Sequence, residues 1–170
     1  VGYATKVKNT KFVLYSFNKL NENIKSNLLL NIVGDGPELE NLRLIAKSNS
    51  INAVFHGYKN QNEILPFYRN ADIFIQPSLV DRWPQTYNEA LSSGICSMVS
   101  NKCGIDDEYV RKYFNNVVFD VNDELDFLEK FLNLYNEKEL REKIKIDALK
   151  ISVNSDAIVQ SKFLAKFLIT

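Results

Sequence analysis

Two acidic residues, Asp81 and Glu89, lie near a predicted helix start, with seven residues between them. The apolar run at residues 73–75 is typical of a buried strand, and apolar residues recur at helical spacing after Pro84. Proline suits the first turn of a helix, where its missing N–H would have no partner. The helix therefore begins near Pro84, with Glu89 inside it and Asp81 in the loop before it. Open α/β sheets bind ligands in such strand-to-helix crevices, so we expect both carboxylates to face its mouth.

Strand and helix patterns alternate along the chain. Strand patterns cover residues 1–4, 28–33, 53–56, 73–76, 96–100 and 117–119, and helical patterns cover 10–22, 37–48, 64–68, 84–93, 123–135, 138–151 and 155–168. This alternation predicts a doubly wound α/β domain with a parallel, Rossmann-like sheet. The apolar run 28–33 is expected to be a central strand covered on both faces. Lys8, Gly34, Gly57, Asp81 and Gly104 should collect at the carboxyl ends of the strands.

Composition limits the classes of protein. With 170 residues, 45% of them apolar and 25% charged, the chain is long enough for one globular domain with a real core. Lysine plus arginine equals aspartate plus glutamate at 21 each, so no overall field attracts nucleic acid or an anionic membrane. We therefore predict no nucleic-acid partner. No apolar stretch is long enough to span a bilayer and no signal peptide is visible, which favours a cytoplasmic location.

Cys96 and Cys103 are the only cysteines, and His56 is the only histidine. A disulfide framework or a zinc site is therefore not expected, and free thiols are the default. Cys96 lies in an apolar run and is expected in the core, whereas Cys103 is expected to be a small loop residue. His56 ends a predicted strand and is expected to be a hydrogen-bonded structural residue rather than a catalyst.

The stretch 77–94, PSLVDRWPQTYNEALSSG, carries a family resemblance. It resembles the E-x7-E signature of family 4 nucleotide-sugar glycosyltransferases, which are retaining enzymes with two facing Rossmann-like domains (GT-B architecture). Asp81 stands where many members carry the first glutamate, Gln85 where asparagine is frequent, and Glu89 is the second glutamate. The resemblance extends over nearly the whole chain, with matching pieces in order at 1–2, 8–9, 34–37, 55–57, 71–73, 77–78, 81–89 and 104.

The resemblance implies how a donor diphosphate would be held. Lys8 matches the family's phosphate lysine, and the backbone amides of Gln85 and Thr86 match its helix donors. A helix N-terminus presents unpaired N–H groups and a partial positive charge to an anion. Tyr3 stands where the family usually carries a second cation, an arginine, so Lys6 or Arg82 would have to substitute.

The rest of the donor is assigned by the same resemblance. Glu89 would accept hydrogen bonds from the ribose hydroxyls, since one carboxylate can take two O–H donors. Asp81 would contact hydroxyls of the transferred sugar. Gly57 would let the backbone approach the nucleobase closely, with Tyr58 and Lys59 beside it, and Gly34 would lie at the same edge.

Each of these residues also has a purely structural interpretation. Lys8 could be a solvated loop lysine, Glu89 a surface carboxylate, and Asp81 a helix cap near Pro84. Gly34, Gly36 and Gly57 could serve only as turn residues, and Trp83 is expected to anchor the helix rather than touch the donor.

We predict no metal and no cofactor, the nucleotide sugar being a co-substrate. The acids at 106–108 suggest a metal site, but no D-x-D pattern follows a strand, and the family implied by the resemblance needs no divalent ion.

The hypothesis is that residues 1–170 form the C-terminal donor-binding domain of a retaining glycosyltransferase, using a UDP-sugar to build a bacterial surface polysaccharide such as O-antigen or capsule. The chain opens directly on a strand pattern without a methionine, so we expect it to be a piece of a longer protein that lacks its N-terminal domain. That domain would bring a lipid-linked or glycan acceptor, with the whole enzyme at the inner membrane face, and the chain alone would bind nucleotide and transfer little or no sugar.

Three other interpretations stay open at this point. The chain could be a nucleotide-binding module without catalysis, a sugar-nucleotide epimerase of the same architecture, or a phosphorylase, although no motif for a pyridoxal-phosphate lysine is visible. The apolar residues near the end, at 163–164 and 167–169, are more than one domain face needs and predict a missing partner or self-association of the fragment.

Overall fold

The structure is a computed structural model that describes residues 1–82, 84–104 and 117–149. Its elements in chain order are η1 (Lys6–Lys8), α1 (Thr10–Asn18), α2 (Glu22–Asn27), β1 (Leu30–Ile32), α3 (Leu39–Ser48), β2 (Ala53–Phe55), α4 (Gln61–Asn70), β3 (Ile73–Gln76), α5 (Gln85–Ser92), β4 (Cys96–Ser100), β5 (Val118–Phe119) and α7 (Glu124–Asn136). Residues 138–149 are also helical. Trp83, the acids at 106–108, the predicted helix 155–168 and its apolar patch lie outside the described residues.

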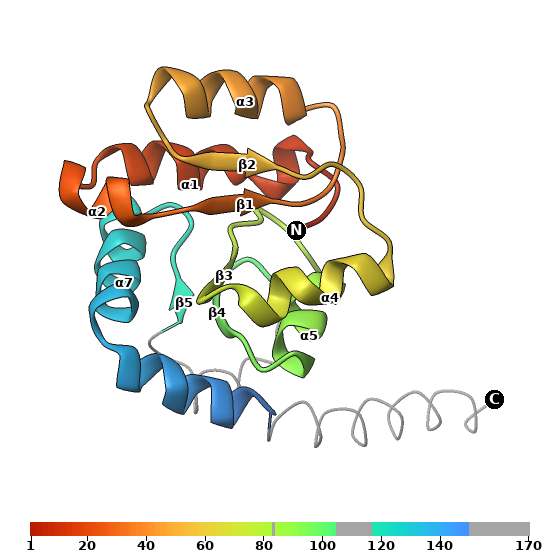
Figure 1. The fold of residues 1–170 in the computed structure, drawn as a ribbon, viewed down its shortest axis with the longest axis vertical. Helices are drawn as coiled ribbons and strands as arrows, with labels where there is room; N and C mark the ends of the chain where they lie inside the picture. The colour runs from red at the N-terminus through yellow and green to blue at the C-terminus, as the bar shows by residue number, and fades with distance from the viewer. Residues whose placement is uncertain (83, 105–116, 150–170) are drawn as a thin grey trace.

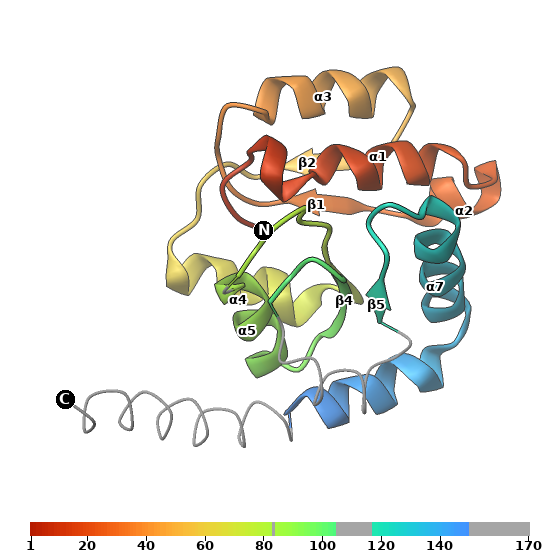
Figure 2. The same cartoon turned by 180° about the vertical axis from the view of Figure 1, so that it is seen from behind.

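All strand pairings in the described part of the chain are parallel. β1 pairs with β2, and β3, β4 and β5 pair in that order. Helices lie on both faces, since α1 is behind the β1–β2 ladder in Figure 1 and in front of it in Figure 2, whereas α4 is in front of β4 in Figure 1. The predicted α/β class with a parallel, Rossmann-like arrangement is therefore confirmed.

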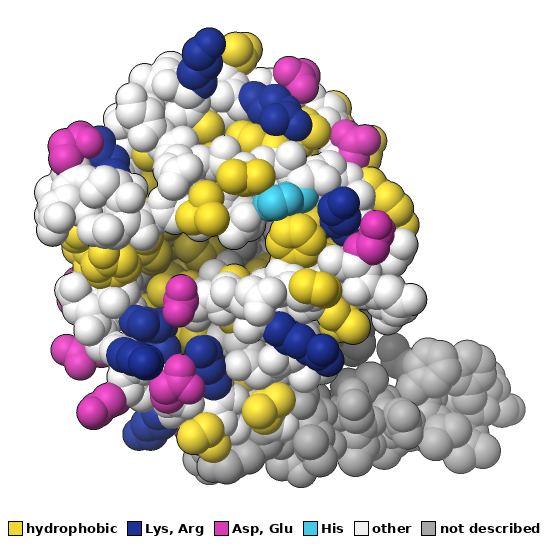
Figure 3. Space-filling model, viewed as in Figure 1, with side chains coloured by type: hydrophobic (Ala, Val, Ile, Leu, Met, Phe, Trp, Pro, Cys, Tyr) yellow, Lys and Arg dark blue, Asp and Glu magenta, His cyan; other side chains and the backbone are white. Residues whose placement is uncertain are grey.

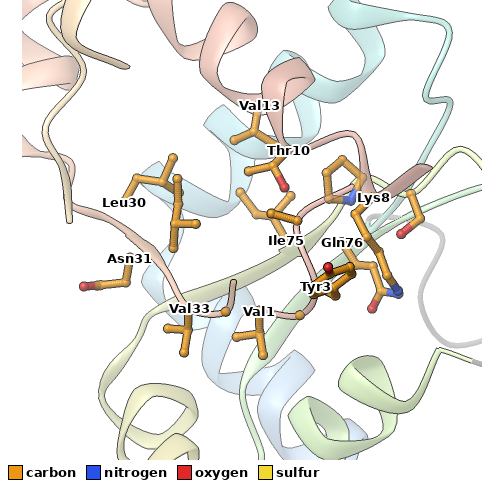
Figure 4. Close-up of a pocket in the computed structure, with 16 residues that line it drawn as sticks. Val1, Tyr3, Lys8, Thr10, Val13, Leu30, Asn31, Val33, Ile75 and Gln76 are labelled. Atoms are coloured by element: carbon orange, nitrogen blue, oxygen red, sulfur yellow. The ribbon is translucent and has the colours of Figure 1, made fainter. Parts of the chain in front are cut away.

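One predicted strand is absent. The described strands form a two-stranded and a three-stranded sheet, and residues 1–4 are not a strand. This first segment makes two backbone bonds to the residues after β1, from Gly2 N to Val33 O at 2.9 Å and from Ala4 N to Asp35 O at 2.6 Å. A pocket between the two sheets is lined by this segment, by 30–34 and by 75–78 (Figure 4).

The fully buried central strand is β4 and not the one predicted at 28–33. All five residues of β4 are buried, while β1 exposes Asn31 and pairs with β2 alone. Figure 3 shows hydrophobic side chains in a hollow between the part with β1 and β2 and the part with β3 to β5. Asn31 interrupts the apolar run because one face of β1 meets solvent.

Two helix boundaries differ from the sequence pattern because side chains cap the backbone. Asn21 accepts a hydrogen bond from Ile24 N at 2.9 Å, which starts α2 and divides the helix predicted at 10–22. Asn60 and Glu63 form a capping box that starts α4 at Gln61, earlier than the pattern at 64–68 predicted, and Pro66 lies inside this helix.

The larger core contains a cluster of phenylalanines that joins α1, β5 and α7. The ring of Phe127 is fully buried and its centroid lies 5.1 Å from that of Phe12 and 4.9 Å from that of Phe119. Phe17 and Phe131 continue the cluster with centroids 4.6 Å apart. A second, smaller cluster packs α1 against α3 through Leu14, Leu42, Ile45 and Ala46.

Both cysteines are buried, as free thiols. Cys96 lies in the core as predicted, and burial raises its pKa to about 12. Cys103 lies in the loop after β4, as predicted, and it is only 8% exposed. In the part of the chain that the structure describes, no helix has the length and apolar character needed to cross a bilayer.

Candidate functional site

Three glycines bring the first segment, β1 and β2 together. The N–H of Gly34 donates to Gly57 O at 2.8 Å, and a Cβ added to Gly34 would lie 1.9 Å from Gly2 O. A Cβ on Gly2 would lie 3.8 Å from the methyl group of Thr86 in α5. The carboxyl ends of β1 and β2 therefore meet the N-terminal turn of α5, where the sequence placed Gly34, Gly57 and Thr86.

Hydrogen bonds connect Lys8 to α5 through two side chains. Lys8 Nζ lies 2.6 Å from Asp81 Oδ2, which also accepts from Gln76 Nε2 at 2.9 Å. The hydroxyl of Thr86 donates to Gln76 Oε1 at 3.0 Å. Lys8 ends η1 and Gln76 ends β3, so secondary structure places both at this edge, and Figure 4 shows them near each other beside Tyr3.

The structure contradicts the purely structural interpretations of Lys8 and Asp81. The side chains of Lys8 and Asp81 are 31% and 13% exposed, so Lys8 is not a freely solvated loop lysine. Asp81 is not a helix cap, since Pro84 takes that position in α5 and no side-chain cap bond forms there. The backbone of Asp81 is fixed by the loop after β4, with Gly104 N donating to Asp81 O at 2.6 Å.

The N-terminus of α5 is suited to an anion. The helix begins at Gln85, one residue after the predicted start at Pro84, and the N–H groups of Tyr87 and Asn88 donate to Pro84 O. Since no described side chain caps this end, the first-turn N–H groups of Gln85 and Thr86 can donate to a ligand. Gln85 is exposed and Thr86 is half-buried at the end of the Lys8 network.

Glu89 lies in a cleft between α4 and α5. Lys59, Gln61, Ile64, Gln85 and Asn88 line this cleft with it. Its Oε2 accepts a hydrogen bond from the hydroxyl of Tyr68 at 2.9 Å, so Glu89 is not a freely solvated surface carboxylate. Lys59 therefore lines the same cleft as Glu89, whereas its neighbour in the sequence, Tyr58, is 76% exposed.

The remaining candidates divide between exposed and structural residues. Tyr3, Lys6 and Arg82 are all exposed, and only Tyr3 lines the pocket that Lys8 also lines. His56 is a bonded structural residue as predicted, with Nε2 2.8 Å from Asn31 Oδ1. Gly34, Gly36 and Gly57 have φ values of 131°, 142° and 66°, which fits turn residues that need glycine.

Sequence reasoning missed Gln76 and Tyr68. Gln76 is a polar residue ending an apolar strand and is only 4% exposed, which could have marked it. Tyr68 looks like an ordinary core residue at helical spacing, and nothing in the sequence shows that its hydroxyl reaches Glu89. Among the described residues, no group of three or more histidine, cysteine, aspartate or glutamate side chains is arranged to hold a metal ion.

Comparison with known proteins points to one family. A family model described as glycosyl transferases group 1 matches residues 1–150. Protein CapJ of Staphylococcus aureus is 29% identical over 159 residues, which cover 82% of the chain and 39% of CapJ. A GDP-mannose-dependent alpha-mannosyltransferase of Corynebacterium glutamicum is 28% identical over 99 residues, which cover 58% of the chain and 23% of that protein. The chain therefore matches less than half the length of either relative.

Solved structures share the fold at lower identity. The catalytic domain of cholesterol-alpha-glucosyltransferase from Helicobacter pylori matches with a TM-score of 0.80 at 22% identity, covering 91% of the chain and 95% of that domain. Anabaena HepE in complex with UDP matches with a TM-score of 0.81 at 13% identity, covering 98% of the chain and 47% of HepE.

Proposed function

The chain belongs to the group 1 glycosyltransferases, and on that premise we propose that it is the donor-binding, C-terminal half of a retaining family 4 enzyme that uses a UDP-sugar. The parallel α/β fold, which matches the Rossmann-like domains of GT-B glycosyltransferases, supports this placement. HepE, one of the structures of the same fold, is a complex with UDP, which favours a UDP-sugar. The mannosyltransferase relative is GDP-mannose-dependent, so GDP belongs in any test of the base.

One observation carries the proposal: a lysine, the N-terminus of a helix and a carboxylate lie close together at the carboxyl ends of the strands. Hydrogen bonds through Asp81 and Gln76 connect Lys8 to Thr86. Glu89 lies on the same helix as Thr86, about one turn later. A diphosphate at the start of α5 would meet Lys8 and two backbone N–H groups, while Glu89 would accept the ribose hydroxyls.

The ion pair is compatible with donor binding. An ammonium group has three donors, so Lys8 can keep its bond to Asp81 and give another to a phosphate oxygen. Asp81 uses Oδ2 for both Lys8 and Gln76, which leaves Oδ1 for a hydroxyl of the transferred sugar.

Transfer would proceed by displacement on one face of the anomeric carbon. The bond from that carbon to the diphosphate oxygen breaks, the acceptor oxygen forms the new bond, and the acceptor proton passes to the departing diphosphate. Lys8 and the first-turn amides of α5 stabilise the negative charge where it develops. The proposed reaction uses no metal ion and no cofactor.

The rest of the enzyme would supply the acceptor. We propose an N-terminal domain that faces this one and brings a lipid-linked or glycan acceptor at the cytoplasmic side of the membrane. The similarity to CapJ supports a role in surface polysaccharide synthesis. Residues 1–170 alone should bind nucleotide and transfer little sugar.

Calorimetry with UDP, GDP, ADP and uridine tests the donor site. Lys8→Ala should weaken UDP binding about tenfold or more, because it removes a charge-assisted contact to phosphate, and should leave uridine binding unchanged. Glu89→Ala should weaken both UDP and uridine, since both carry the ribose. Lys47→Ala, an exposed lysine at the end of α3, removes the same charge elsewhere and should change neither affinity.

Unchanged UDP affinity in both Lys8→Ala and Glu89→Ala would contradict the site. A nucleotide-binding module without catalysis is the second candidate, because an exposed and uncharged residue, Tyr3, stands where members of the family usually carry an arginine. Product analysis of the full-length enzyme separates the two, since only a transferase consumes the UDP-sugar in an acceptor-dependent way. An epimerase would convert the sugar nucleotide without any acceptor.

A further inference from the structure

Tyr68 connects α4 to the carboxylate of Glu89 in α5. Its hydroxyl lies 2.9 Å from Glu89 Oε2 and 3.4 Å from the carbonyl oxygen of Thr86, while the residue as a whole is only 2% exposed. The ring is held by packing, with its centroid 5.7 Å from that of Phe74 in a T-shaped arrangement. The hydroxyl therefore reaches Glu89 from a fixed position.

The hydroxyl is not needed to fill space, because phenylalanine would pack the same ring. A buried hydroxyl is unfavourable unless it is hydrogen-bonded, and here the partner is the Glu89 carboxylate. Burial, together with the hydrogen bond and charge of Glu89, raises the pKa of Tyr68. The phenol therefore stays protonated, and its O–H group donates the hydrogen bond to Glu89. Tyr87 offers a contrast on α5, since it is equally buried and its hydroxyl has no hydrogen-bond partner among the described residues.

We propose that Tyr68 is a positioning residue of the nucleotide site, whose hydroxyl fixes the Glu89 carboxylate in the orientation that accepts the two hydroxyls of a ribose. The inference rests on the proposed function, because it deepens the role given there to Glu89. Glu89 forms part of the wall of two clefts, one shared with Lys59 and Gln85 and one shared with Tyr68 and Arg69.

The hydrogen bond from Tyr68 occupies only part of the Glu89 carboxylate. Tyr68 donates to Oε2, which leaves Oε1 and the second lone pair of Oε2 to accept the 2′ and 3′ hydroxyls. A glutamate without this contact would have to lose side-chain freedom when the nucleotide binds, which lowers affinity. The loss of affinity should therefore be largest for ligands that carry the complete diol.

The test compares UDP and GDP with their 2′-deoxy analogues by calorimetry. Tyr68→Phe should weaken binding of UDP or GDP about fivefold and change binding of the 2′-deoxy analogue much less, so the preference for ribose falls. Glu89→Gln should reduce the same preference, and adding Tyr68→Phe to it should have little further effect. Tyr87→Phe is the matched control, because it removes a buried tyrosine hydroxyl two residues from Glu89 and should preserve the preference.

The possible results separate this inference from the proposed function. If Glu89→Gln loses the ribose preference but Tyr68→Phe keeps it, the positioning role is wrong and the nucleotide site stands. Equal weakening of ribose and deoxyribose ligands by Tyr68→Phe would indicate a merely structural hydroxyl and would also overturn the inference. If the unsubstituted protein binds neither UDP nor GDP, the proposed function and this inference both fall.

Discussion

At the scale of single residues, burial decides which charges matter in the site. The pair Lys8–Asp81 has an aspartate that is only 13% exposed, whereas Glu22 in the pair with Lys25 is 87% exposed. An exposed pair contributes little because water screens it and two side chains must be ordered. Lys8 is held instead by a partly buried hydrogen-bond network, so its position is set before a phosphate binds. This arrangement would reduce the entropy lost on donor binding.

Gly34 provides the sharpest stability prediction at this scale. Gly34→Ala should destabilise the protein by about 3 kcal/mol or more, because its φ of 131° is unfavourable for alanine and the new Cβ would meet backbone atoms of Gly2. Gly57→Ala is the matched control, with a left-handed φ of 66° but no atom within 4 Å of the new Cβ, and should cost about 1 kcal/mol. Urea denaturation measures both values. Equal losses would show that backbone strain, and not the close approach to Gly2, sets the requirement.

At the scale of elements, α4 and α5 form the two walls of the cleft with Glu89. α4 begins with a reciprocal capping box and carries Tyr68, while α5 begins without a side-chain cap and carries Glu89. The difference suits their proposed roles, since the capped helix is a firm support and the uncapped one keeps N–H groups for an anion.

The cap of α4 can be tested directly. Asn60→Ala should lower the free energy of unfolding by about 1 kcal/mol, because Asn60 accepts from the N–H groups of Asn62 and Glu63. Asn70→Ala changes the same residue type at the other end of the helix, where its side chain is exposed, and should have no comparable effect. Thermal or urea unfolding followed by circular dichroism supplies the measurement. If Asn60→Ala were as stable as the unsubstituted protein, the capping box would not be a support of this helix.

At the scale of the whole molecule, the phenylalanine cluster ties distant parts of the chain together. α1 belongs to the first third of the chain, while β5 and α7 come after residue 117, and Phe127 lies at their junction. Because only Asn9 separates Lys8 from α1, this packing also supports the position of the proposed phosphate lysine.

Truncation of Phe127 should therefore weaken the entire domain. Phe127→Ala should destabilise it by about 3–5 kcal/mol, the range for removing a fully buried aromatic ring from a core. Tyr15→Ala removes an aromatic ring that is 49% exposed on α1 and should cost far less. Chemical denaturation followed by tryptophan fluorescence gives both values, and a small loss in Phe127→Ala would mean that α7 packs only loosely on α1.

Local features of the sequence determined the elements that carry the site. Pro84 set the start of α5, apolar periodicity placed Tyr87, Ala90 and Leu91 in the core, and strands β3 and β4 have the predicted bounds. The placement of Lys8, Gly34, Gly57 and Asp81 at one edge followed from parallel topology, which the alternation of strands and helices indicates.

Only the tertiary structure decided which of these residues touch. Lys8 and Asp81 are separated by 73 positions, and Tyr68 and Glu89 by 21, so no local periodicity could pair them. The break between the two sheets and the exposed face of β1 also depend on long-range packing. Sequence patterns report the burial and backbone preference of each segment, whereas hydrogen bonds between segments depend on how those segments meet in space.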